Sequence, residues 1–239
     1  MTERYDSAAA RHYAAYRPPL HRVILERVLR PGEFFQTGLD IGCGTGYSAV
    51  ALTRYCGRVL GLDPSAAMLA AAPRHPGITY LHGSGDALGQ LPVPAVEVVT
   101  FAGSLFYAKS GELRKELGRV CAPGATILVY DFEVFLDAAM AEAGVDQPAP
   151  TGDYDHQANL SGWAEFAVEV SGAERIQLAV SGNEMAHLLL ADSNRYDAFL
   201  KRFPNRDPFE PLAGILNARG GAIPLPVGLY FTRYRVLGK

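Results

Sequence analysis

The sequence has few cysteines, and it has no long apolar run. Three cysteines among 239 residues are too few and too scattered for a disulfide framework. None of the six histidines pairs with another at a metal-ligand spacing on a helix face, so we predict no metal site. No apolar stretch reaches the length of a membrane span, and the first residues lack the apolar core of a secretory signal. These absences favour a cytoplasmic protein with no membrane partner.

An excess of positive charge is also missing. The chain has 22 Lys and Arg against 25 Asp and Glu, and the basic residues form no stripe. Nucleic-acid partners are therefore disfavoured, because phosphate backbones are usually bound by a basic patch. An apolar content of 49% and a length of 239 residues fit one α/β domain with an insertion. We predict a globular protein; nothing in the sequence indicates an oligomeric state.

The most informative segment is rich in glycine. Residues 38–46 read Gly-Leu-Asp-Ile-Gly-Cys-Gly-Thr-Gly, an apolar strand that ends in a turn, and a helix-like stretch follows. Glycines 42, 44 and 46 let the backbone turn sharply and let a ligand lie against the main chain at a helix N-terminus. Cys43 lies in this turn, where a small residue is needed, so we expect packing rather than nucleophilic chemistry from it.

Two acids accompany this turn. Asp40 lies just inside it, where its carboxylate can face a ligand, and Asp63 ends the next apolar strand. In βαβ nucleotide sites an acid at the position of Asp63 binds the ribose hydroxyl pair. The alternative is a glycine-rich turn that only connects a strand to a helix.

The glycine spacing argues against a dinucleotide. Counted from Gly42, the third glycine of that fingerprint would be residue 47, which is Tyr47. The weaker variant Gly44, Gly46, Ala49 matches, but it starts beyond the strand end and leaves Asp40 to repel a pyrophosphate. A ligand with a cationic amino-acid end and a ribose suits both acids, and S-adenosylmethionine (SAM) has those parts. An NAD-linked oxidoreductase stays open as an alternative.

At this point the chain resembles the class I SAM-dependent methyltransferases. Gly38–Gly46 is similar to their first motif, Val59–Leu69 to the second and Gly83–Leu91 to the third. Val96–Tyr107 resembles their fourth strand with its loop, and Arg119–Tyr130 their turn into strand five. The resemblance covers about residues 5–133. It implies that the cofactor-binding residues are Asp40, Gly42, Cys43, Gly44, Gly46, Asp63, Pro64, Met68, Asp86, Ala87, Phe101 and Ala102.

Particular roles follow from the resemblance. Asp63 would bind the ribose, Asp86 the adenine amino group, and the Ala87 amide a ring nitrogen. Residues 10–18 resemble the Tyr-x-x-Tyr-Arg-Pro entry of small-molecule members, which include relatives of the quinone-biosynthesis and trans-aconitate methyltransferases. There Tyr16 and Arg17 would fold over the methionine end of the cofactor. The alternative is an amphipathic N-terminal helix with an exposed arginine.

Strand and helix patterns alternate from about residue 37 to 130. Short Val-, Ile- and Leu-rich strands separated by helices predict a doubly wound, Rossmann-like α/β fold. With the resemblance, we expect a mainly parallel seven-stranded sheet with an antiparallel last strand. We predict one domain: a helical cap (1–32), a SAM-binding core (33–133), a substrate lid (134–222) and a closing strand (223–239).

Finer expectations concern four segments. Pro123-Gly124 predicts a turn. Residues 132–140 predict a helix, and 185–190 with 194–203 predict two more. Phe166–Val170 and Ile176–Val180 predict a hairpin about residues 171–174.

Candidate catalytic residues follow the predicted strand ends, because ligands of an open α/β sheet bind beyond those ends. Tyr107 stands in a loop where many relatives have a histidine, and it either orients a substrate or packs. Asp131 follows strand five directly, and it either faces substrate or caps the next helix. The other candidates are possible bases and roof residues, each more often a surface or core residue: His12, His21, His156 and His187, with Trp163 and Tyr154.

The resemblance implies methyl transfer from SAM, with S-adenosylhomocysteine as product, to a small organic acceptor. The reaction is an in-line displacement on an activated sulfonium, so much of the rate comes from positioning, and a base is needed only if the nucleophile must lose a proton. A protein of this fold that binds SAM without methylating is the main alternative, since fold alone does not fix activity. A macromolecule methyltransferase is disfavoured by the absence of a basic run.

Overall fold

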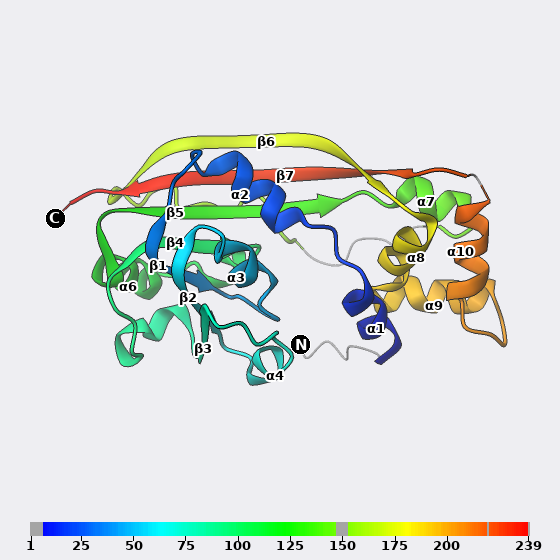
Figure 1. Cartoon of the computed structure of the whole chain (residues 1–239), viewed down its shortest axis with the longest axis horizontal. Coiled ribbons are helices and arrows are strands. Elements are labelled where there is room, and N and C mark those ends of the chain that lie inside the picture. Colours follow the sequence, from blue (N-terminus) through cyan, green and yellow to red (C-terminus); the bar gives the residue numbers. More distant parts are fainter. Residues whose placement is uncertain (1–6, 147–152, 219, 239) are drawn as a thin grey trace. The chain divides into compact units, whose positions relative to one another are not determined.

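The computed structural model describes residues 7–146, 153–218 and 220–238. They contain a seven-stranded sheet in the order β3-β2-β1-β4-β5-β7-β6 (Figure 1). Pairing is parallel from β3 to β5, and β6 and β7 run antiparallel, with Glu165 opposite Leu237 and Ser171 opposite Thr232. The predicted fold class is thereby confirmed. The strands are β1 (Phe35–Ile41), β2 (Cys56–Asp63), β3 (Ile78–His82), β4 (Val96–Ala102), β5 (Cys121–Val134), β6 (Phe166–Val180) and β7 (Ile223–Val236).

The described residues form two compact units, and each of the strands β5, β6 and β7 contributes residues to both units. The sheet unit comprises residues 19–132, 154–174 and 229–238; the helical unit comprises 7–18, 133–146, 153, 175–218 and 220–228. The helices of the sheet unit are α2 (Leu20–Val28), α3 (Tyr47–Leu52), α4 (Ala66–Ala70), the 3-10 helix η1 (Gly85–Gln90), α5 (Leu105–Ala108) and α6 (Gly111–Val120). Those of the helical unit are α1 (Ser7–Ala15), α7 (Asp137–Glu142), α8 (Gly182–Leu190), α9 (Ser193–Arg202) and α10 (Phe209–Asn217). In the described ranges no helix is long and apolar enough to cross a membrane. The predicted division into cap, core and lid stays a prediction.

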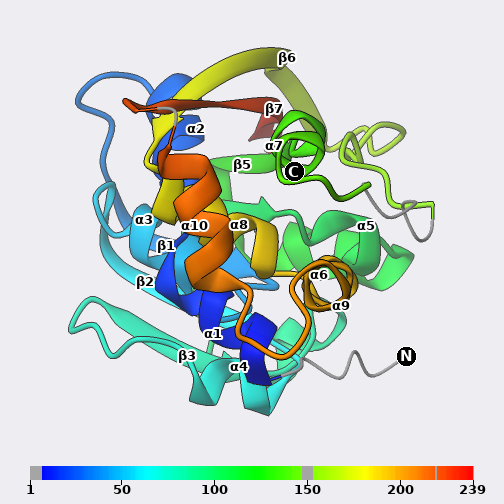
Figure 2. The ribbon, with the colours of Figure 1, turned by 90° about the vertical axis from the view of Figure 1, so that its right-hand side faces the viewer.

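Helices cover both faces of the parallel strands in the sheet unit. α2 and α3 pack together on one face, and α5 and α6 lie on the other (Figure 2). The α6 helix begins where the Ser110 side chain accepts a hydrogen bond from the Leu113 amide, and it buries Leu113, Leu117 and Val120 at helical spacing. These residues pack with the buried side chains of the strands in one apolar core, which holds the strand ends in position.

The helical unit is organised around α8. A capping box between Ser181 and Glu184 starts this helix, and its apolar face is buried. α1, α7, α9 and α10 all contact it (Figure 2). Of these helices, α10 was not predicted from the sequence.

The predicted hairpin is wrong, because β6 runs unbroken from Phe166 to Val180. Gly172 lies inside the strand, where a Cβ would come within 2.7 Å of the Phe231 ring. The glycine therefore permits close packing between neighbouring strands rather than a turn.

One further local prediction is wrong, and another is right only in part. Pro123 and Gly124 lie within β5, at an irregularity where pairing shifts from Val96 with Cys121 to Val98 with Thr126. Of the helix predicted over residues 132–140, only the part from Asp137 onward forms, in α7, because β5 continues to Val134. At residues 132–134 the strand overrides the local helix signal.

A buried histidine pair joins α1 to α8 and predicts a pH dependence of stability. His12 Nδ1 lies 2.9 Å from His187 Nδ1, and both rings stack on Phe209. Burial has the largest effect on His12 and lowers its pKa, and the positive charges of His187 and Arg11 lower it further. The negative charge of Asp207 acts in the opposite direction and raises the pKa of His12. Burial also lowers the pKa of His187. The unfolded chain takes up protons more readily, so this stability is present above about pH 6.5 and is lost as the pH falls below it.

We therefore expect the thermal midpoint of the wild type to fall between about pH 7.5 and pH 5 by more than that of His12→Gln with His187→Gln. Calorimetry at both pH values measures the difference. An equal fall in the two proteins would contradict this account of the pair.

Candidate functional site

The strand order reverses between β1 and β4, which is where open α/β sheets bind ligands. The loops after these two strands touch each other. The Ser104 hydroxyl donates to the Ile41 carbonyl at 2.5 Å, and a Cβ on Gly42 would lie 2.4 Å from the Ser104 Cβ. The carboxyl ends of β1 and β4 thus form one continuous edge.

The glycine loop after β1 has a backbone that L-residues rarely adopt. Gly42, Gly44 and Gly46 have φ values of 72°, 53° and 80°. Gly46 must also lack a side chain, since a Cβ there would lie 2.3 Å from the Tyr80 hydroxyl. Above Gly44, in contrast, no described atom lies within 4 Å of a Cβ position, so the main chain is open to a ligand.

Asp63 fastens this loop to the end of β2. One carboxylate oxygen accepts the Gly44 N–H and the other the Ser65 N–H, both at 2.8 Å. The side chain is nearly buried, which strengthens both bonds. A carboxylate oxygen can accept more than one hydrogen bond. The binding of ribose hydroxyls by Asp63 stays a prediction.

Asp40 lies differently from our expectation. We expected its carboxylate to face the ligand; it is fully buried instead. Its oxygens accept hydrogen bonds from the hydroxyls of Ser48, at 2.5 Å, and Thr100, at 2.7 Å. Burial raises the pKa of Asp40 to about 6 against the lowering effect of these bonds. Asp40 therefore braces the loop against α3 and β4.

Other residues of the predicted cofactor site lie along the same edge of the sheet unit. Asp86, in η1, is exposed and accepts a hydrogen bond from the Ser110 hydroxyl at 2.5 Å. The Met68 amide, near the start of α4, donates to the Ser65 side chain. Burial, with the charges of Asp40 and Asp63, raises the pKa of the Cys43 thiol, which makes it a poor nucleophile. The predicted cofactor contacts of Asp86, Met68, Pro64 and Ala87 stay predictions.

The glycine loop also has an unsatisfied polar neighbour. The Tyr80 hydroxyl is buried against Gly46 and has no hydrogen-bond partner in the described part of the chain. A buried polar atom usually has a hydrogen-bond partner. A polar ligand in the glycine loop, or a water molecule bound with it, could supply the partner of the Tyr80 hydroxyl. Together with the open main chain at Gly44 and the Asp63 carboxylate, it fits a nucleoside with a polar tail.

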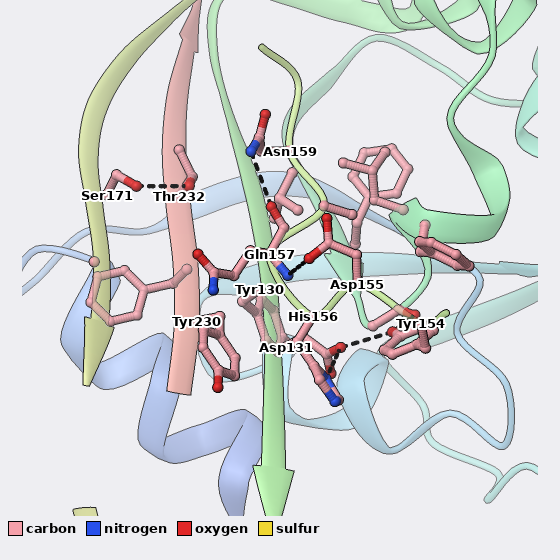
Figure 3. A pocket seen from close by; sticks show the side chains of 18 residues that line it. Tyr130, Asp131, Tyr154, Asp155, His156, Gln157, Asn159, Ser171, Tyr230 and Thr232 are labelled. Carbon is pink, nitrogen blue, oxygen red and sulfur yellow. Dashed lines mark hydrogen bonds and ion pairs between the residues drawn. The ribbon is translucent and has the colours of Figure 1, made fainter. Parts of the chain in front are cut away.

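A second pocket opens beside the loop after β4. Figure 3 shows Asp131, within β5, pointing toward Tyr154 and His156. The residues that line this pocket include Phe101, Gly103, Phe106, Asp131, Tyr154, His156, Tyr230 and Phe231.

Asp131 is the centre of a hydrogen-bonded group. One of its oxygens lies 2.8 Å from the Tyr154 hydroxyl and 2.8 Å from His156 Nδ1 (Figure 3). Its other oxygen accepts the Phe132 amide at 2.8 Å. The Tyr154 hydroxyl also lies 2.6 Å from the Gly103 carbonyl oxygen. Asp131 lies within β5 rather than directly after it, because the strand continues to Val134. It lines the pocket and caps none of the described helices, and its contact with a substrate stays a prediction.

The other predicted candidates are spread over the fold. Tyr107 is 77% exposed and packs on the Tyr154 ring without lining the pocket; its catalytic role stays a prediction. Trp163 packs against the apolar core, and His21 Nδ1 lies 3.2 Å from the Tyr130 hydroxyl. The link from Asp131 to Tyr154 and His156 was missed, although the Asp-Tyr-Asp-His run at 153–156 is a signal that could have indicated it.

Tyr16 and Arg17 belong to the helical unit. The Arg17 guanidinium lies 3.4 Å from the centre of the Tyr13 ring, a cation–π contact. The contact of Tyr16 and Arg17 with the cofactor stays a prediction.

Comparison with known proteins agrees with this geometry. Residues 39–129 match the methyltransferase domain family. A Saccharomyces cerevisiae protein assigned as an S-adenosylmethionine-dependent methyltransferase is 24% identical over 138 residues, 54% of this chain and 46% of that protein, so the chain spans less than half of its length. The ubiquinone biosynthesis O-methyltransferase of Serratia proteamaculans is 25% identical over 169 residues, 62% of this chain and 69% of that enzyme.

Solved structures show the same fold. A protein of Anaeromyxobacter dehalogenans assigned as a type II methyltransferase superposes with a TM-score of 0.63 at 23% identity, over 94% of this chain and 100% of that one.

The glycine loop gives a prediction on stability with a matched control. Gly42→Ala adds both a positive-φ penalty and an overlap with Ser104, so we expect it to lower the free energy of unfolding by about 3 kcal/mol. Gly44→Ala adds only the φ penalty, about 1 kcal/mol. Urea unfolding measures both, and a Gly44→Ala variant as destabilised as Gly42→Ala would show that the loop is closed, not open, above Gly44.

Proposed function

The chain belongs to the class I SAM-dependent methyltransferase superfamily, and from this we propose that it transfers a methyl group from SAM to a small organic acceptor. The observation that carries the proposal is that Asp63 is hydrogen-bonded to a glycine loop with an open main chain, at the point between β1 and β4 where the strand order reverses. That arrangement offers main chain and a carboxylate to a nucleoside, with no base or metal required for binding.

In this proposal the cofactor lies over Gly42, Gly44 and Gly46. Asp63 accepts the ribose hydroxyls, and the exposed Asp86 with the Ala87 amide binds adenine. Asp40 acts from beneath by holding the loop, and its carboxylate adds negative potential below the cationic methionine end. When bound, SAM supplies an electrophilic methyl on a positively charged sulfur.

The acceptor pocket supports methyl transfer because it begins at the same edge. Phe101 and Gly103, at the end of β4, line the pocket that Asp131 and His156 close. Donor and acceptor sites that meet at one loop can bring nucleophile, methyl carbon and sulfur into line, and such positioning can supply about 7–11 kcal/mol of rate acceleration.

Several observations support a small acceptor over a macromolecule. The chain has a net charge of −3 without a basic stripe, and no Lys or Arg is among the described residues that line the pocket. The Serratia relative is named as an O-methyltransferase of a biosynthetic pathway, which favours an oxygen acceptor here as well. We also propose a cytoplasmic location.

The binding claim is tested by titration calorimetry of SAM with the wild type and Asp63→Ala. We expect the variant to bind at least about 100-fold more weakly, because two charge-assisted hydrogen bonds that hold the loop and the ribose acceptor are lost together. Asp197→Ala, an exposed position on α9, is the matched control and should bind like the wild type. Heat released by NAD but not by SAM, or equal affinity in Asp63→Ala, would contradict the proposal.

Transfer is tested with SAM labelled in its methyl group and offered with catechol, trans-aconitate, benzylamine or dithiothreitol. We expect label in at least one product. Tight SAM binding with no transfer in cells or extracts would favour the alternative of a binding protein, and label found only in RNA or protein would exclude the small acceptor.

A further inference from the structure

The contact between His156 and Asp131 determines which ring nitrogen of His156 is available for chemistry. His156 Nδ1 lies 2.8 Å from an Asp131 oxygen, and a carboxylate only accepts, so Nδ1 carries the proton. In the neutral ring the lone pair is therefore on Nε2, for which the described residues provide no hydrogen-bond partner. The His156 ring stacks on the Tyr230 ring, with the ring centroids 5.7 Å apart and an interplanar angle of 18°.

Three titratable groups face this imidazole: Asp131, Tyr154 and Tyr230. Asp131, on β5, stabilises the positive ring that forms when Nε2 takes a proton. Burial and then the charge of Asp131 raise the pKa of Tyr154, so its hydroxyl stays protonated and donates. Tyr230, on β7, contacts the ring by its face. Of the groups bonded to Asp131, His156 is thus the one that can accept a proton.

The group is also fastened next to the donor site. The Tyr154 hydroxyl lies 2.6 Å from the Gly103 carbonyl oxygen, so a hydrogen bond joins the Asp131 cluster to the loop after β4. Phe101 and Gly103 line the same pocket as His156. An acceptor in this pocket contacts His156 on one side and the loop that flanks the cofactor on the other.

The pocket selects the acceptor in two ways. Its walls include the rings of Phe101, Phe106, Tyr154, Tyr230 and Phe231, and aromatic rings pack favourably on one another. General-base removal of a proton by an imidazole is easier from a phenol, whose hydroxyl titrates near about 10, than from an aliphatic alcohol, whose hydroxyl is about as weakly acidic as water.

We propose that His156 is the general base of the transfer, positioned by Asp131, and that the acceptor is a phenol. The inference rests on the methyl transfer proposed above. Nε2 takes the hydroxyl proton as the phenol oxygen bonds to the methyl carbon; the carbon–sulfur bond breaks, and its electron pair stays on the now neutral sulfur. The products are an aryl methyl ether and S-adenosylhomocysteine, and the imidazolium then releases its proton to water.

The test compares two phenols of different acidity in the wild type and His156→Gln, at about pH 8. For catechol, which is largely protonated there, we expect kcat to fall by at least about 100-fold in the variant. For 4-nitrophenol, which is largely ionised there, the fall should be less than about fivefold, because no proton has to be removed. A role of His156 in folding alone would reduce both rates equally.

Three further measurements accompany the comparison. His75→Gln, in the loop before β3, is the matched control and should keep both rates. Asp131→Asn should lower kcat for catechol more than it raises KM, and it should shift the pH range over which kcat rises. His156→Gln should abolish this rise of kcat with pH. Ring nitrogen NMR of the protein without SAM should show His156 as the Nδ1–H tautomer, and a mixture of tautomers in Asp131→Asn.

The outcomes separate this inference from the proposed function. Equal losses for both phenols, no loss with catechol, no transfer to either phenol, or a His156 ring protonated on Nε2 alone would overturn it. Transfer to benzylamine or dithiothreitol without transfer to a phenol would overturn the inference and leave the methyltransferase proposal standing. Failure to bind SAM would instead overturn the proposed function.

Discussion

The two hydrogen bonds accepted by Asp63 are the constraint on which the site depends. They join the glycine loop after β1 to the start of α4, so the tips of two neighbouring parallel strands are held as one edge. Glycine is needed at Gly42 and Gly46 because Ser104 and Tyr80 occupy the space that a Cβ would take. The open main chain at Gly44 is what remains for a ligand.

Asp40 and Asp131 extend this arrangement in different ways. Asp40 is buried beneath the loop and links α3 to β4 through Ser48 and Thr100. Asp131 lies within β5 and is hydrogen-bonded to Tyr154 and His156 beside the loop that follows β4. The parallel strands therefore place three carboxylates at one edge. Asp40 holds the loop, Asp63 joins the loop to the start of α4, and Asp131 lines the pocket. In our proposal Asp63 also binds the ribose and Asp131 positions the group that acts on the acceptor, which suits methyl transfer by positioning.

The sequence allowed the parallel half of the fold to be predicted because its signals are local. The strand, glycine turn and helix around Asp40 and Gly42 all lie within a few residues of one another, and the acid at Asp63 ends the next strand. The hairpin prediction failed because Gly172 serves packing against Phe231, a residue that is distant in sequence. The same limit hid the site chemistry: Asp131 was predicted from its position after a strand, but its bonds to Tyr154 and His156 depend on tertiary folding. The burial of Asp40 also depends on Thr100, which no local pattern connects to it.

The central claim is that the glycine loop clasped by Asp63 is the binding site of a SAM-type nucleoside. Amide NMR of the full chain during titration with S-adenosylhomocysteine tests it most directly, because each loop glycine reports separately. The account predicts saturable shifts of the Gly42, Gly44, Gly46, Ser65 and Ala87 amides with one shared dissociation constant. Saturable binding that leaves these amides unmoved and shifts only residues elsewhere would contradict it.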